Sequence, residues 1–272
     1  MPSLSDHASS SAVKMLLFGP SGVGKTGAIA SLAAAGYRCF IFDFDNGLDI
    51  LMDPTVLPVE FRKNVFFKTF RDEHKPLQGK LLQTATAWKE FSAALGDWKE
   101  DGKSLGNFMS WGENDVLIID SITFLSDAAF NEALGIGGRL NARPQIQDYG
   151  AAMDSIQSVF ELLYGSQCKC NVLVTSHLQY AADEVAGGAR KAMVSVLGNK
   201  LAPKLPRYFN NMVLLKKIIS GGKVVRKLLT QGDATVDLKT SKPGSVPAEM
   251  EPDLAKLFAL LKGESAAAPK AA

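Results

Sequence analysis

Short apolar runs alternate along this chain with longer stretches in which apolar residues recur every three or four positions. The early apolar runs are nearly continuous, which is typical of central strands covered on both faces of a sheet. The runs predict strands at 13–19, 38–44, 64–70, 115–120, 171–177, 211–218, 223–230 and 235–241.

Helical spacing fills most intervals between these runs. It predicts helices within 26–36, 81–100 and 146–165, and a short helix over 251–263. Alternating strands and helices indicate a parallel sheet with right-handed crossovers. In the last third, strands follow one another closely, and "SGGK" at 220–223 predicts a hairpin turn. We therefore expect an α/β fold: a mostly parallel central sheet flanked by helices, ending in an antiparallel strand meander.

The 272 residues contain no internal repeat and no composition break that would separate two domains. We expect a disordered lead-in at 1–12, a single domain at 13–262 and a disordered tail at 263–272. No apolar run approaches the roughly 20 residues of a membrane span, and the first residues have no apolar segment of the secretory type. We expect a cytoplasmic protein without a membrane partner.

Cysteine usage agrees with a reducing compartment. The three cysteines are Cys39, Cys168 and Cys170, an odd and sparse set. Cys168 and Cys170 form one C-x-C pair without a second pair or a nearby histidine. This favours free thiols over a zinc site.

The stretch "GPSGVGKT" at 19–26 follows the first predicted strand and satisfies G-x-x-x-x-G-K-[ST]. Glycines let the backbone wrap phosphates so that consecutive N–H groups point inward. Lys25 would reach the β- and γ-phosphates, and the Thr26 hydroxyl would coordinate Mg²⁺. The expected ATP-binding residues are Gly19, Pro20, Ser21, Gly22, Val23, Gly24, Lys25, Thr26 and Gly27.

Three further polar side chains end predicted strands at the same sheet edge. Asp120 closes the apolar run "DVLIID" and would help to hold Mg²⁺. Asp45, in "FDFDNGLD", would orient and deprotonate the attacking water. His177 ends "VLVTSH" and would hydrogen-bond phosphate or water. Lys25, Asp45 and His177 are thus the expected catalytic residues.

The basic residues are unevenly distributed. Between 181 and 227 there are ten Lys or Arg against two acidic residues, a net +8. Because the whole chain carries only +2, the remainder is at −6. This asymmetry predicts a localised site for a polyanion.

Over roughly 13–242 the chain resembles the phage Sak-type single-strand annealing proteins, which have a RecA-like P-loop ATPase core. The motifs are "GPSGVGKT", "FDFDNGLD", "VLIIDSIT", "VLVTSH" and "LKTSKPG". The RecA-like pattern has a catalytic glutamate where this chain has Asp45, one methylene shorter. It commonly has glutamine where this chain has His177.

The resemblance implies the remaining site residues. In RecA-like assemblies, lysines of one subunit reach the nucleotide of its neighbour, and Lys239 and Lys242 occupy that stretch here. Two loops bind single-stranded DNA, which correspond to 132–150 and to 179 through about 207. The expected DNA-binding residues are Arg139, Arg143, Arg190, Lys191, Lys200, Lys204 and Arg207.

The resemblance predicts a DNA-stimulated ATPase with ATP and Mg²⁺ as cofactors that pairs DNA strands in recombination. Its expected partners are single-stranded DNA, further copies of the chain in a ring or filament, and a single-strand binding protein, in a host bacterial cytoplasm. Two alternatives stay open. One is a nucleotide-gated loader or regulatory protein that acts on a protein partner, and the other is a small-molecule kinase with the same phosphate loop.

Overall fold

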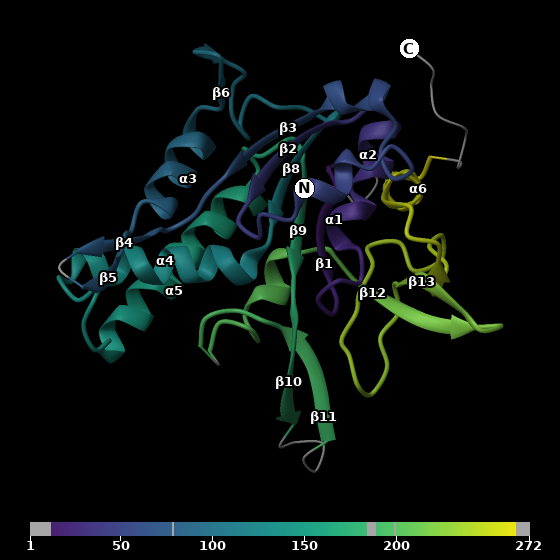
Figure 1. Ribbon diagram of the computed structural model, residues 1–272. Coiled ribbons are helices and arrows are strands. Elements are labelled where there is room, and N and C mark those ends of the chain that lie inside the picture. Colours follow the sequence, from purple (N-terminus) through teal and green to yellow (C-terminus); the bar gives the residue numbers. More distant parts are fainter. Residues whose placement is uncertain (1–11, 78, 184–188, 199, 265–272) are drawn as a thin grey trace, which may run out of the picture.

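The structure is a computed structural model that describes residues 12–77, 79–183, 189–198 and 200–264. An eight-stranded sheet with the order β14-β13-β12-β1-β9-β8-β2-β3 crosses this part of the chain (Figure 1). Its strands are β1 (Lys14–Phe18), β2 (Arg38–Asp43), β3 (Val65–Thr69), β8 (Asp115–Asp120), β9 (Asn171–Ser176), β12 (Asn211–Ser220), β13 (Lys223–Leu229) and β14 (Glu249–Met250). The pairs from β3 to β12 are parallel, whereas β13 and β14 join antiparallel.

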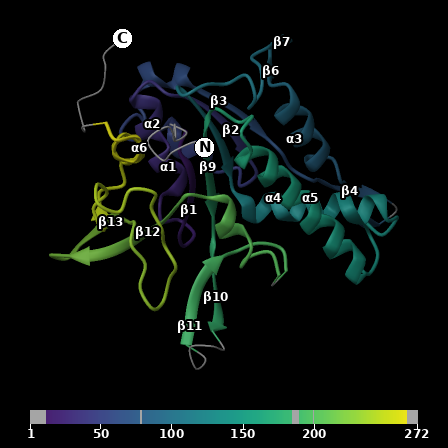
Figure 2. The same ribbon diagram turned by 180° about the vertical axis from the view of Figure 1, so that it is seen from behind.

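Helices cover both faces of the sheet (Figures 1 and 2). Leu16 and Phe18 of β1 pack into the core on one face, with α3 (Ala87–Gly96), α4 (Ile122–Ile136) and α5 (Ile146–Tyr164). Met15 and Leu17 point to the other face, with α1 (Lys25–Ala28), α2 (Ala30–Ala34) and α6 (Leu254–Lys262). Because neither face meets water, the central strands need apolar residues at every position, and the apolar runs follow from this.

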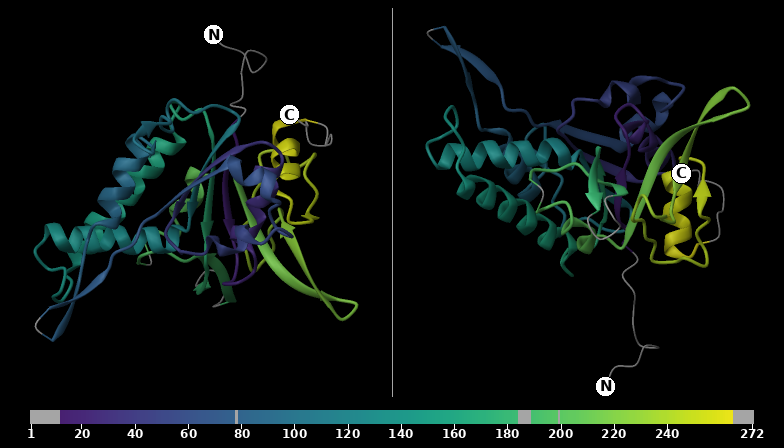
Figure 3. Two further views of the ribbon diagram at one scale, coloured as in Figure 1. Left: turned by 45° about the horizontal axis from the view of Figure 1, so that its top comes forward. Right: turned by 90° about the horizontal axis from the view of Figure 1, so that it is seen from below.

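Three two-stranded hairpins extend from the sheet. They are β4 (His74–Leu77) with β5 (Lys80–Gln83), β6 (Lys99–Glu100) with β7 (Lys103–Ser104), and β10 (Leu178–Asp183) with β11 (Ala189–Val194). Short 3₁₀ helices lie at η2 (Leu48–Met52), η3 (Val59–Asn64) and η4 (Leu205–Tyr208). Figure 3 shows that the β4–β5 hairpin and the β12–β13 hairpin project at opposite ends of the molecule.

The predicted fold class is confirmed, including the antiparallel ending of a mostly parallel sheet. The "SGGK" turn is also confirmed, since Gly221 and Gly222 have φ of 57° and 75° between β12 and β13. Positive φ at both central residues is the geometry of a tight hairpin turn that suits the twist of the strands. The helices predicted within 26–36, 146–165 and 251–263 are present, the first of them as α1 and α2.

One predicted helix is shorter than expected, and one predicted strand is wrong. The helix predicted within 81–100 is present but covers only Ala87–Gly96, since residues 80–83 pair with β4. Asp72 explains where the helix begins, because its carboxylate accepts the N–H groups of Thr86 and Ala87. The strand expected at 235–241 is a loop that meets its neighbours only in isolated bridges, after a turn in which the Asp233 carboxylate accepts backbone N–H groups.

Most of the expected lead-in and tail, residues 1–11 and 265–272, lies outside the described residues. Within the described part of the chain, no helix combines the length and apolar character needed to cross a bilayer.

Candidate functional site

The loop of residues 19–24 joins the carboxyl end of β1 to α1. Two of its glycines are required by the backbone. Gly24 has a φ of 106°, a left-handed conformation that side chains other than glycine rarely adopt. A Cβ on Gly19 would lie 2.4 Å from the Leu215 carbonyl oxygen, so β12 leaves no space for one. The glycines of the motif therefore fix the path of this loop.

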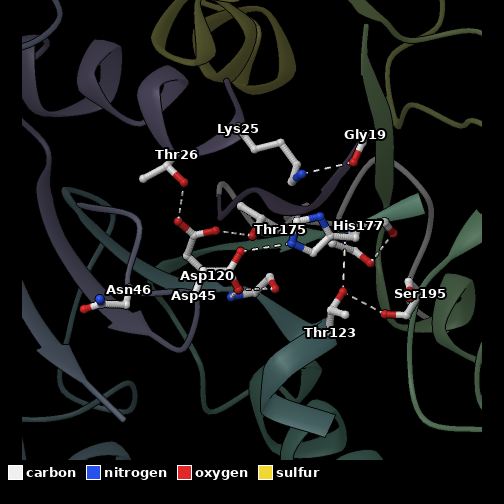
Figure 4. Close-up of polar contacts among 12 residues, drawn as sticks. Gly19, Lys25, Thr26, Asp45, Asn46, Asp120, Thr123, Thr175, His177 and Ser195 are labelled. Atoms are coloured by element: carbon white, nitrogen blue, oxygen red, sulfur yellow. Dashed lines mark hydrogen bonds and ion pairs between the residues drawn. The ribbon is translucent and has the colours of Figure 1, made fainter. Parts of the chain in front are cut away.

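Lys25 is held inside the loop. Its side chain is buried, and its Nζ donates to the carbonyl oxygen of Gly19 at 3.0 Å (Figure 4). It also donates to the carbonyl oxygen of Pro20 at 3.1 Å. Burial lowers the pKa of Lys25, while the negative charges of Asp120 and Asp45 act in the opposite direction. A bound phosphate would give this ammonium a stronger acceptor than the two carbonyl groups.

Asp120 and Thr26 form an oxygen pair beside Lys25. The Thr26 hydroxyl donates to Asp120 Oδ2 at 2.7 Å, and the Thr175 hydroxyl donates to Oδ1 (Figure 4). Asp120 is fully buried, and this burial raises its pKa.

A hydroxyl and a carboxylate so close together fit Mg²⁺, a cation that takes oxygen ligands from one or two protein groups and from phosphates. Thr26 and Asp120 are the residues that would hold it. Among the described residues, there is no cluster of three or more His, Cys, Asp or Glu suited to a metal. A magnesium ion shared with phosphates does not require one.

Asp45 and His177 form a pair at the same edge. Asp45 Oδ2 lies 3.1 Å from His177 Nε2, and Oδ1 accepts from the N–H and hydroxyl of Ser121 at 3.1 and 2.6 Å (Figure 4). Burial raises the pKa of Asp45, but the bonds from His177 and Ser121 and the nearby charges leave it below its usual value. Asp45 is therefore ionised at neutral pH and orients the imidazole.

Thr123, at the start of α4, links His177 to the β10–β11 hairpin. Its hydroxyl accepts the N–H of His177 at 3.1 Å and donates to the Ser195 carbonyl at 2.8 Å (Figure 4). The N–H of Ser195 in turn donates to the His177 carbonyl at 2.9 Å. His177 and Ser195 directly flank the hairpin, so one hydroxyl ties both of its ends to the site.

The first expected DNA loop, 132–150, is shorter in the structure, because α4 continues to Ile136 and α5 begins at Ile146. Arg139 forms an ion pair with Asp148, whose carboxylate also accepts the Gln145 N–H at the start of α5. This pair lowers the pKa of Asp148 to about 2. The Arg139 side chain thus stabilises the helix start, while Arg143 is exposed.

The second expected loop begins as the β10–β11 hairpin rather than as an irregular segment. Tyr180 is 64% exposed, and its direct partner across the hairpin is Ala192. Arg190 lies two residues from Ala192 on the same strand, so it shares the face of Tyr180. Lys191 points to the other face, where its Nζ lies 2.8 Å from Asp237 Oδ2. Residues 184–188 and 199 of this stretch lie outside the described residues.

The other predicted cations lie away from Lys25. Lys200, Lys204 and Arg207 are exposed, and Arg207 donates to the Gln157 side chain and the Tyr208 hydroxyl. Lys239 donates to the Pro206 carbonyl at 2.6 Å, and burial lowers its pKa. Lys242 lies beside the end of α6, where a Cβ on Gly263 would come 2.6 Å from its Nζ.

Four residues near the site had no role in the sequence-based prediction. Ser121 and Thr175 stand next to assigned residues within "VLIIDSIT" and "VLVTSH", so the motifs contained a signal for them. Thr123 carries no such signal, because only the fold brings α4 to the hairpin ends. Arg226 of β13 donates to the Val23 carbonyl at 2.8 Å. In the sequence it cannot be distinguished from an ordinary basic residue of a strand.

The family described as "AAA domain" matches residues 11–239. A comparison with curated protein sequences finds no match.

Similar solved structures include the following three. An ATPase of the type III secretion system of pathogenic bacteria has 14% identity and a TM-score of 0.41, over 75% of this chain and 52% of that one. This chain therefore spans about half the length of that ATPase. The RadB recombinase has 13% identity and a TM-score of 0.42, over 80% of this chain and 79% of that one. A KaiC-like protein from Pyrococcus horikoshii has 11% identity and a TM-score of 0.42, over 84% and 82%.

Proposed function

Because the chain belongs to the AAA-domain family and has the fold of a RecA-like P-loop ATPase, we propose that it is a magnesium-dependent ATPase of recombination. In this proposal it binds single-stranded DNA and promotes annealing, as the Sak-type proteins that it resembles do. One observation carries the proposal: Lys25, Thr26, Asp120 and the Asp45–His177 pair converge at one sheet edge from four separate strand ends.

Each residue has a distinct task in hydrolysis. Lys25 and the loop of residues 19–27 would bind the phosphates, and Thr26 and Asp120 would hold Mg²⁺, which would neutralise charge on the phosphates. Asp45 keeps the His177 imidazole in one orientation. The pair would accept the proton of the attacking water and hold it at this edge of the sheet.

The β10–β11 hairpin supports the DNA-binding part of the proposal. Tyr180 and Arg190 are diagonal neighbours on one face of the hairpin. They are therefore close enough for a base to stack on the tyrosine ring while a nearby phosphate binds the guanidinium. Such contacts do not depend on sequence and weaken with salt. Among the basic residues predicted to bind DNA, Arg143, Arg190, Lys200, Lys204 and Arg207 are exposed and suited to this role.

An oligomer would complete the site. Within the described chain, no contact joins Lys242 to Lys25, Asp120 or Asp45, since Lys242 lies beside Gly263. If this lysine acts on a nucleotide, it acts on that of a neighbouring subunit. This favours a ring or filament.

One observation supports a second function. Asp45 is shorter than the glutamate of the RecA-like pattern, and its low pKa makes it a weak base. A protein that binds ATP and hydrolyses it slowly would act as a nucleotide-gated loader on a protein partner.

The deciding experiment is ATP hydrolysis with and without single-stranded DNA, for the wild type, Lys25→Ala and Lys242→Ala. We expect stimulation by DNA that both substitutions abolish. ATP binding without turnover would favour the loader. Turnover that ignores DNA and is normal in Lys242→Ala would contradict the recombination function and the oligomeric site.

A further inference from the structure

Arg226 brings a cation of β13 to the phosphate loop of the same chain. Its Nε donates to the Val23 carbonyl at 2.8 Å. A Cβ on Gly24 would lie 3.1 Å from this Nε and 3.3 Å from Cδ. The guanidinium therefore lies against the last turn of the loop before Lys25.

The charge of Arg226 has no counter-ion among the described residues. Its antiparallel partner on β12 is Lys217, on the same face of the hairpin, and neither forms an ion pair within the described chain. Like charges directly opposite each other destabilise a strand pair. Both side chains are exposed, so this face of the hairpin presents Arg226, beside the phosphate loop, and the adjacent Lys217 to an anion bound by the loop.

The opposite face of the same hairpin provides the contrast. Lys216 and Lys227 also pair directly, but Lys227 forms ion pairs with Glu251 at 2.6 Å and with Glu249 at 4.0 Å. Lys216 interacts electrostatically with Asp233. The protein thus compensates the cation pair that faces away from the loop and leaves the pair that faces it uncompensated.

We propose that Arg226 is a phosphate-binding residue of the nucleotide site in cis, which holds the loop through Nε and binds the polyphosphate through its terminal nitrogens. An arginine can do both at once, because its planar fork carries five N–H donors and one is used by Val23. The ligand class is a nucleoside di- or triphosphate. The inference rests on the proposed nucleotide site and adds one phosphate-binding residue, Arg226, to it.

The test measures the affinity of fluorescent ATP and ADP analogues for the full chain as wild type, Arg226→Gln, Arg226→Lys and Lys216→Gln. The last variant is the matched control, since it removes the same charge from the other face of the hairpin. We expect Arg226→Gln to weaken ATP and ADP binding about tenfold, a typical loss for one charge-assisted contact. Arg226→Lys should recover part of this loss, and the control should bind like the wild type.

Melting temperatures separate phosphate binding from a purely structural role. We expect nucleotide-free Arg226→Gln to melt near the wild-type temperature, because relief of the repulsion with Lys217 offsets the lost bond to Val23, and to gain less from added ATP. A lower melting temperature without nucleotide, together with an undiminished gain from ATP, would assign Arg226 to loop structure alone and overturn the inference. So would an affinity equal to that of the control. If the wild type bound no nucleotide, the proposed function itself would fail.

Discussion

The proposed magnesium-binding function of Asp120 conflicts with the stability of the fold. Its carboxylate is fully buried, and burial raises its pKa although Thr175 and Thr26 donate hydrogen bonds to it. A carboxyl group with a higher pKa in the folded state binds more protons folded than unfolded. Its ionisation therefore lowers the free energy of unfolding as the pH rises above its unfolded pKa. A bound magnesium ion would reverse this by favouring the charged form.

We expect Asp120→Asn to raise the melting temperature of the nucleotide-free protein by about 2–4 °C at pH 8, since the buried side chain at position 120 then carries no charge. The gain should shrink towards pH 5, where the wild-type carboxyl is closer to protonation. ATP hydrolysis should be lost. Thermal melting at both pH values is the measurement, and a variant less stable than the wild type at pH 8 would contradict the interpretation.

Asp45 and His177 form one functional unit in the proposed mechanism, because the carboxylate orients the ring that it contacts. We expect Asp45→Asn and His177→Ala each to lower kcat about 100-fold, the lower range for loss of a general base. The double variant should be no slower than either single one, as for residues that act together. Losses that multiply in the double variant would show that the two residues act independently.

At the scale of elements, the central strands could be predicted because burial on both faces imposes continuous apolar runs, as in 115–120 and 171–176. The phosphate loop could be predicted because its chemistry is local in sequence. The β10–β11 hairpin could not. Its strands contain alanine, arginine and lysine and are only partly buried, so their pairing leaves little trace in the pattern. Contacts between distant elements, such as Thr123 with Ser195, have no sequence signal either.

Thr123 is expected to couple the hairpin to the nucleotide site, because its hydroxyl bonds to both residues that flank the hairpin. Thr123→Val keeps the shape and removes both bonds. We expect this variant to keep unstimulated ATP hydrolysis within about twofold of the wild type while most of the stimulation by single-stranded DNA disappears, a coupling loss of about 1–3 kcal/mol.

Thr123→Ser serves as the control, since it retains the hydroxyl and should behave like the wild type. Hydrolysis rates over a series of DNA concentrations provide the measurement. Full stimulation of Thr123→Val would contradict the coupling, as would an equal loss in Thr123→Ser.

At the scale of the whole molecule, the proposed site is incomplete in one chain, because Lys242 lies beside Gly263 and away from Lys25. The ends of the molecule also differ. The β12–β13 hairpin projects at one end and the β4–β5 hairpin at the other (Figure 3). At the β12–β13 end, Ile219 is 81% exposed and Val224 is 62% exposed. In the proposed assembly, head-to-tail contacts between such ends would generate a ring or filament and would place each subunit against the site of the next.

Mixing two inactive variants tests this arrangement. Lys25→Ala chains lack a working phosphate loop but keep Lys242, whereas Lys242→Ala chains keep the loop. If Lys242 acts on the neighbouring subunit, mixed oligomers contain some complete sites. In these sites a Lys242→Ala chain provides the intact phosphate loop and a neighbouring Lys25→Ala chain provides Lys242. Random head-to-tail assembly gives about a quarter of the wild-type sites, so about a quarter of the wild-type rate should return. No recovery in mixtures that demonstrably exchange subunits would place Lys242 outside the active site.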